Sequence, residues 1–78
     1  MPTTQRPGYQ RFLERLKTAR VRAALTQTEA AKRLRRPQSY VSKCESGERR
    51  VDVVELAEFA QLYGRPLAYF VEKGHGER

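Results

Sequence analysis

The stretch Thr26-Gln-Thr-Glu-Ala-Ala-Lys-Arg-Leu-Arg-Arg-Pro-Gln-Ser-Tyr-Val-Ser-Lys-Cys-Glu-Ser-Gly47 predicts two short helices separated by a tight turn. It begins with a threonine, and Glu29 follows three residues later. This spacing favours a capping box, in which each side chain accepts a hydrogen bond from a free backbone N–H at a helix start. We therefore expect a helix over residues 27–34. A second helix is expected to open at Pro37, whose missing N–H is harmless in a first turn, and to close at Gly47.

Apolar and polar residues fall on opposite faces of these two helices. Small and apolar side chains are expected to face a common core: Ala30, Ala31, Leu34, Val41 and Cys44. The outward face of the second helix is rich in hydrogen-bond donors and carries Gln38, Ser39, Ser42 and Lys43, with Tyr40 beside them. Two short helices packed in this way form a helix-turn-helix. An ordinary solvated surface is the alternative explanation of the polar face.

Helical periodicity continues on both sides of this stretch. From about Tyr9 to Ala24, apolar or small side chains recur every three or four residues: Phe12, Leu13, Leu16, Ala19 and Ala23. Asp52 repeats the capping pattern and starts a helix that ends at Gly64, with the expected inward residues Val53, Leu56, Ala57, Ala60 and Tyr63. Pro66 opens a short fifth helix that carries Leu67, Phe70 and Val71. No stretch alternates as a half-buried strand would, so we predict an all-α fold of five helices.

The chain of 78 residues is expected to form one domain over residues 9–72, between flexible segments at 1–8 and 73–78. Its only cysteine, Cys44, excludes an internal disulfide and is expected in the core, and His75 has no identifiable second ligand or acid–base partner. We expect no metal, no cofactor and no catalytic residues. No apolar run reaches the roughly 18 residues of a membrane span, and we expect a cytoplasmic protein.

The positive charge lies in the first two thirds of the chain. Residues 1–51 hold thirteen Lys and Arg against four Asp and Glu, whereas residues 52–78 hold three against five. This asymmetry is typical of a protein whose basic part faces a polyanion. Simple solvation of the helix surfaces by these side chains is the alternative.

Three ordered blocks of the chain resemble the lambda-repressor-like family of helix-turn-helix proteins, of the Cro and xenobiotic-response-element type. They are Leu25-Thr-Gln-Thr-Glu-Ala-Ala-Lys-Arg-Leu34, Pro37-Gln-Ser-Tyr-Val-Ser-Lys-Cys-Glu-Ser-Gly47, and Val53-Val-Glu-Leu-Ala-Glu-Phe-Ala60 with Tyr63-Gly64. The resemblance covers roughly residues 9–71. It implies a five-helix DNA-binding domain whose second motif helix enters the major groove of double-stranded DNA.

The resemblance also implies roles for individual residues. Positions that read base edges in the family are occupied here by Gln38, Ser39 and Lys43. Gln27 matches a glutamine that binds a DNA phosphate, with simple solvation as the alternative. Contacts with the DNA backbone or thymine methyl groups are implied for Tyr40 and Ser42, with packing support alone as the alternative for Tyr40. A buried ion pair between helices one and three is implied for Arg20 and Glu45.

The turn departs from the family pattern. Arg35 replaces the usual glycine, Arg36 an apolar residue and Pro37 a serine or threonine, while Ala30 replaces the common leucine. Either Arg35 accepts a positive φ at a cost of about 1 kcal/mol, or the turn has another shape. We expect both turn arginines to contact DNA phosphates. For Arg49 and Arg50 in the next loop, phosphate contact and solvation are equally good explanations.

These patterns lead to a functional hypothesis. We expect a sequence-specific transcriptional regulator, a repressor, that acts as a homodimer through its C-terminal helices, with Leu67, Tyr69 and Phe70 at the interface. Prokaryotic or phage origin and association with the nucleoid would fit it. No small-molecule ligand is expected, because no residues remain for a ligand domain. The alternative is an antitoxin or adaptor module whose main partner is another protein.

Overall fold

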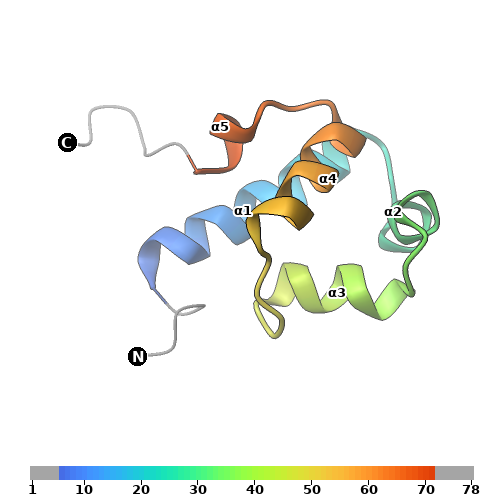
Figure 1. Ribbon diagram of the computed structural model, residues 1–78, viewed down its shortest axis with the longest axis horizontal. Helices are drawn as coiled ribbons and strands as arrows, with labels where there is room; N and C mark the ends of the chain where they lie inside the picture. The colour runs from blue at the N-terminus through green and yellow to red at the C-terminus, as the bar shows by residue number, and fades with distance from the viewer. Residues whose placement is uncertain (1–5, 72–78) are drawn as a thin grey trace.

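The computed structural model describes residues 6–71, and all its regular structure is helical. The helices are α1 (Pro7–Arg22), α2 (Gln27–Leu34), α3 (Gln38–Ser46), α4 (Val53–Tyr63) and α5 (Leu67–Val71). Figure 1 shows α3 along the bottom of the molecule, α2 at one end, α1 and α4 crossing in the middle, and α5 at the top. Helix α1 packs against α3, α4 and α5, and α2 packs against α3 and α4. The predicted all-α, five-helix class is confirmed.

Three helix starts differ from the predictions, one of them that of α5, which begins at Leu67 and not at Pro66. Helix α1 begins at Pro7 and not near Tyr9, because proline suits the first turn of a helix, so residues 7 and 8 are helical. Pro37 precedes α3 as its N-cap, with an extended ψ of 152°, and the first helical residue is Gln38. Arg6 is the N-cap of α1, whereas residues 1–5 and 73–78 of the predicted flexible segments, and with them His75, lie outside the described residues.

Both predicted capping boxes are present. The Glu29 N–H donates to the Thr26 hydroxyl at 3.0 Å, and the Thr26 N–H donates to the Glu29 carboxylate at 2.9 Å. Asp52 and Glu55 repeat this exchange at the start of α4, at 2.8 and 3.0 Å. Each box satisfies two backbone donors that a helix start leaves unpaired. The starts of α2 and α4 are therefore determined locally.

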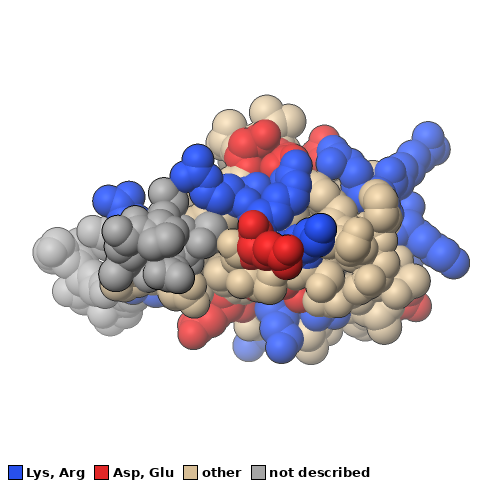
Figure 2. Space-filling model, turned by 90° about the horizontal axis from the view of Figure 1, so that it is seen from below, with Lys and Arg blue, Asp and Glu red and all other residues tan. Residues whose placement is uncertain are grey.

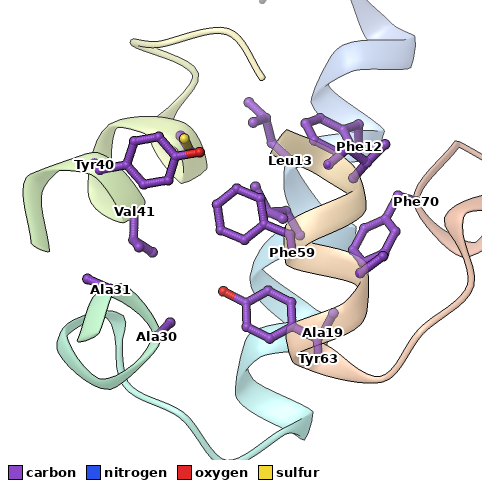
Figure 3. Close-up of a cluster of buried hydrophobic side chains, with 14 residues drawn as sticks. Phe12, Leu13, Ala19, Ala30, Ala31, Tyr40, Val41, Phe59, Tyr63 and Phe70 are labelled. Atoms are coloured by element: carbon purple, nitrogen blue, oxygen red, sulfur yellow. The ribbon is translucent and has the colours of Figure 1, made fainter. Parts of the chain in front are cut away.

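The core is built around Phe59, whose side chain is fully buried. Figure 3 shows Phe59 in the middle of the cluster, with Tyr40 and Val41 of α3 on one side and Phe70 of α5 on the other. The Tyr40 and Phe59 rings stack with centroids 5.9 Å apart and planes 7° apart. The α2–α3 core positions were predicted correctly, since Ala30, Ala31, Val41 and Cys44 are buried and Leu34 packs partly against them.

The inward face of α4 was predicted in part. Leu56, Ala60 and Tyr63 are buried, but Val53 and Ala57 are exposed, and the central Phe59 was missed. Helix α4 is rotated so that residues 55, 56, 59, 60 and 63 face inward. The Phe59 ring fills the space between α3 and α5 better than the small side chain of Ala57 would. Phe59 therefore lies on the inward face of α4, and Ala57 lies on the exposed face.

The α2–α3 turn keeps the left-handed geometry despite its arginine. Arg35 has φ 59° and ψ 44°. Its N–H donates to the Lys32 carbonyl at 3.1 Å, and the Arg36 N–H donates to the Ala31 carbonyl at 2.9 Å. These two bonds form a Schellman motif, which normally ends in glycine because a Cβ is strained at positive φ.

Arg49 and Glu55 fasten the α3–α4 loop to the start of α4. The Arg49 guanidinium donates to both Glu55 carboxylate oxygens, at 2.9 and 2.7 Å. The Glu55 side chain is 11% exposed, and the hydrogen bonds from Arg49 lower the pKa of its carboxyl below the ordinary value. The bond from the Asp52 N–H acts in the same direction.

Relieving the strain at the turn should stabilise the fold. We expect Arg35→Gly to raise the free energy of unfolding by about 0.5–1 kcal/mol, since relief of left-handed strain is partly offset by glycine's freedom in the unfolded chain. Thermal unfolding followed by circular dichroism should show a Tm higher by about 2–8 °C. The matched control Arg33→Gly places glycine inside α2 and should lower the Tm. An equal decrease in both variants would contradict the assignment of strain to Arg35.

The Glu55 carboxylate should make stability depend on pH. Because its pKa is lowered in the folded protein, its contribution is present above the unfolded pKa of about 4.3 and is lost as pH falls through the lower folded value. We expect Glu55→Gln to be less stable than the parent at pH 7, with the difference shrinking below about pH 4 in urea unfolding. Glu58→Gln, which removes a half-exposed carboxylate 3.6 Å from Arg36, is the control and should change stability little. A pH-independent loss in Glu55→Gln would refute the role of this charge.

Candidate nucleic-acid interface

The outward face of α3 presents its polar side chains as predicted. Gln38, Ser39 and Lys43 are exposed and Ser42 is half-buried, while Val41 and Cys44 on the other face are completely buried. The helix is positioned by its inward residues and by Gly47, which ends it with φ 85°. Donors and acceptors on a rigid helix of this size can contact base edges in a DNA major groove.

Gln27 joins the starts of the two motif helices. Its Oε1 accepts a hydrogen bond from Gln38 Nε2 at 2.9 Å, and its Nε2 donates to Glu45 Oε1 at 3.0 Å. Gln27 is the first residue of α2, where unpaired backbone N–H groups and the helix dipole favour an anion. The structure therefore brings this predicted phosphate-binding residue into contact with the predicted base-reading residue.

The implied ion pair between Arg20 and Glu45 is present and buried. Arg20 Nε and Nη2 donate to the two carboxylate oxygens of Glu45 at 2.6 and 3.1 Å, and Arg20 Nη1 donates to the Leu25 carbonyl at 2.8 Å. The side chains are only 10% and 5% exposed. The hydrogen bond with Glu45 raises the pKa of Arg20 above its ordinary value. This pair fixes the last turn of α3 against α1.

Tyr40 lies on the inward face of α3, and not on the outward face with the other residues predicted to contact DNA. The Tyr40 side chain is buried and stacks on Phe59, and the guanidinium groups of Arg36 and Arg49 lie 4.5 and 4.8 Å from its ring centroid. Burial raises the pKa of its hydroxyl to about 12. Residues 40 and 44 lie four positions apart and therefore share one face of a helix with Val41. Because Val41 and Cys44 were predicted to face the core, this spacing already indicates an inward position for Tyr40.

The predicted phosphate-binding arginines have different surroundings. Arg36 lies over Tyr40 and pairs with Glu58 at 3.6 Å, and Arg49 is held by Glu55. Arg35 and Arg50 are exposed. Arg36 and Arg49 therefore stabilise the packing of α3 against α4, a role that sequence reasoning missed because their acidic partners lie in another helix.

Basic side chains gather at the end of the molecule formed by α2. Figure 2, which views the side where α3 lies, shows Lys and Arg projecting from this end and from the edges of the face, with acidic side chains between them. A groove of about 350 Å³ lies between the α2–α3 turn and α4, lined by Arg33, Leu34, Arg35, Arg36, Glu58, Gln61 and Leu62. Arg33 is thus a further cation beside the turn that the sequence analysis did not single out.

Three further findings concern reactivity, metal binding and membrane spans. Cys44 is a buried thiol, and burial raises its pKa, which lowers its reactivity. Within residues 6–71, no three His, Cys, Asp or Glu side chains are grouped so that they could hold a metal ion. No helix in that part of the chain is both long and apolar enough to cross a membrane.

The predicted dimer surface is only partly accessible. Phe70, which was predicted at this surface, is 1% exposed and packs edge-on against Phe12 with centroids 6.5 Å apart, so its side chain belongs to the core. Phe70 faces inward because α5 packs on α1. Leu67 is 45% exposed, Val71 at the end of the same helix is 65% exposed, and Tyr69 is half-buried under Arg65.

Comparison with known proteins agrees with this geometry. Residues 11–69 match the family model described as "Helix-turn-helix domain". No curated protein and no solved structure gives a match. The family match spans most of the chain and includes α2, the turn and α3. The chain therefore belongs to the helix-turn-helix domain family, as the resemblance to Cro-type proteins implied.

Proposed function

We propose that this helix-turn-helix protein is a sequence-specific transcriptional regulator, a repressor, that binds double-stranded DNA as a homodimer. The observation that carries this proposal is the exposed polar start of α3, where Gln38 is held by Gln27 beside exposed Ser39 and Lys43. A glutamine amide can bond adenine at N6 and N7, and a lysine can bond guanine at O6 and N7. These residues would supply sequence preference.

Affinity common to all sequences would come from contacts with phosphates. Gln27 at the start of α2, exposed Arg35 and Arg50, and half-buried Ser42 are proposed to make them. Arg36 and Arg49 contribute chiefly by holding Tyr40 and α3, since both guanidinium groups already face carboxylates. The basic charge at the α2 end adds long-range attraction for DNA.

A single α3 is too short to specify a long site. Its nine residues span about 13 Å, which corresponds to about four base pairs. Two copies with their α3 helices about 34 Å apart would contact successive major grooves. We propose that Leu67 and Val71, the exposed apolar residues of α5, lie at the contact between the two copies.

Titration with DNA at two salt concentrations tests the proposal. Fragments from a random pool and a set of genomic fragments are compared by fluorescence anisotropy. Affinity for every fragment should fall steeply with salt, because phosphate contacts release counterions, and a small subset should bind at least about a thousandfold more tightly. Equal affinity for all fragments would refute sequence-specific regulation and favour a protein partner.

Two substitutions separate base contacts from phosphate contacts. Gln38→Ala should reduce discrimination at one base pair by about 1–3 kcal/mol and leave the salt dependence nearly unchanged. Arg35→Ala should weaken binding to all sequences alike and reduce the salt slope by about one. Binding to the selected site and its single-base variants measures both effects. The opposite pattern would show that the two residues have exchanged roles.

A further inference from the structure

A chain of hydrogen bonds runs from the buried ion pair to the exposed start of α3. The Glu45 carboxylate accepts from Arg20 through both oxygens. Its Oε1 also accepts from Gln27 Nε2 at 3.0 Å, and Gln27 Oε1 accepts from Gln38 Nε2 at 2.9 Å. The Glu45 side chain is 5% exposed, Gln27 is half-buried and Gln38 is exposed, so the chain leads from core to surface.

In this chain of hydrogen bonds, each group can donate only toward Glu45: Gln38 donates to Gln27, and Gln27 donates to Glu45. The Glu45 carboxylate, paired with Arg20, has no proton to donate, so Gln27 must turn its NH₂ group toward it. The Gln27 carbonyl oxygen then points to the other side, where it can only accept. Gln38 must therefore turn its own NH₂ group toward Gln27. One N–H and the carbonyl oxygen of the Gln38 amide remain for another partner.

We infer that Glu45 is a positioning residue for base recognition and sets the orientation of the Gln38 amide through Gln27. The inference rests on the proposed function, in which Gln38 contacts a base. In the major groove adenine offers an acceptor at N7 and a donor at N6, which match the remaining N–H and C=O of Gln38. Guanine offers two acceptors, N7 and O6, and its O6 would oppose the Gln38 carbonyl oxygen. The oriented amide therefore prefers adenine to guanine.

Substitution of Glu45 with glutamine removes the constraint on orientation. A glutamine at this position can donate or accept, so Gln27 and Gln38 are free to turn their amides. The probe is the DNA site recovered by selection, together with its three variants at the base pair where Gln38→Ala loses discrimination. The parent protein should prefer adenine there by about ten- to a hundredfold. Glu45→Gln should lose most of this preference while keeping discrimination at other positions.

A purely structural role of Glu45 would give another result. Lower stability reduces the folded fraction equally for every DNA variant, so it cancels from the ratio of affinities. The matched control is Arg20→Lys, which loses the forked pair but leaves the Glu45 carboxylate as acceptor for Gln27. It should lower the Tm and keep the adenine preference. If Glu45→Gln also keeps that preference, the inference is wrong.

A second variant covers the case in which Glu45→Gln does not fold. Gln27→Leu changes a half-buried residue and interrupts the same chain of hydrogen bonds. It should weaken binding to all sequences and remove the adenine preference, and retention of the preference would overturn the inference. An absence of any sequence preference in the parent protein would instead refute the proposed function itself. The two failures are therefore distinguishable.

Discussion

The buried ion pair between Arg20 and Glu45 is the constraint on which the arrangement of this domain depends. Two charges withdrawn from water are costly unless their remaining hydrogen-bonding groups are satisfied. In this protein these groups are satisfied, because Arg20 also donates to the Leu25 carbonyl and Glu45 also accepts a hydrogen bond from Gln27. The pair thereby ties together the end of α1, the start of α2 and the last turn of α3. Any shift of α3 would break several charged hydrogen bonds at once.

A second set of contacts holds the other side of α3. The Tyr40 ring stacks on Phe59 of α4, and the guanidinium groups of Arg36 and Arg49 lie against the same tyrosine. Each arginine is in turn paired with a carboxylate of α4. Cation–π contacts and paired charges of this kind add to apolar packing. Helix α3 is thus held against α4 by its buried face and by residues in the segments before and after it.

The α2–α3 turn combines strain with exposure. Arg35 adopts a left-handed backbone that glycine would adopt at lower cost, yet its side chain is exposed beside Arg33 and Arg36 at one groove. A glycine there would contribute no charge. The strained residue therefore places a cation next to the start of α3, at a position where its charge favours an anionic partner.

Much of this structure could be predicted from the sequence. The starts of α2 and α4, the end of α4 and the five-helix class depend on side chains a few residues apart: the capping boxes, Gly64 and the apolar spacing. The positions of Ala30, Ala31, Val41 and Cys44 also follow from that spacing. Local hydrogen bonds and helical periodicity act within single segments, so a linear pattern is enough to indicate them.

Only the tertiary structure decided how these helices are rotated and which charges pair. Phe70 is buried and Val53 is exposed, because the inward side of each helix is set by the shape of its neighbours. The partners of Arg36 and Arg49 lie in α4, and the link from Glu45 through Gln27 to Gln38 crosses two helices. The long side chains of arginine, glutamate and glutamine could each meet many partners in an unfolded chain. The partner of each one is determined only when the packed helices bring two such groups within hydrogen-bonding distance.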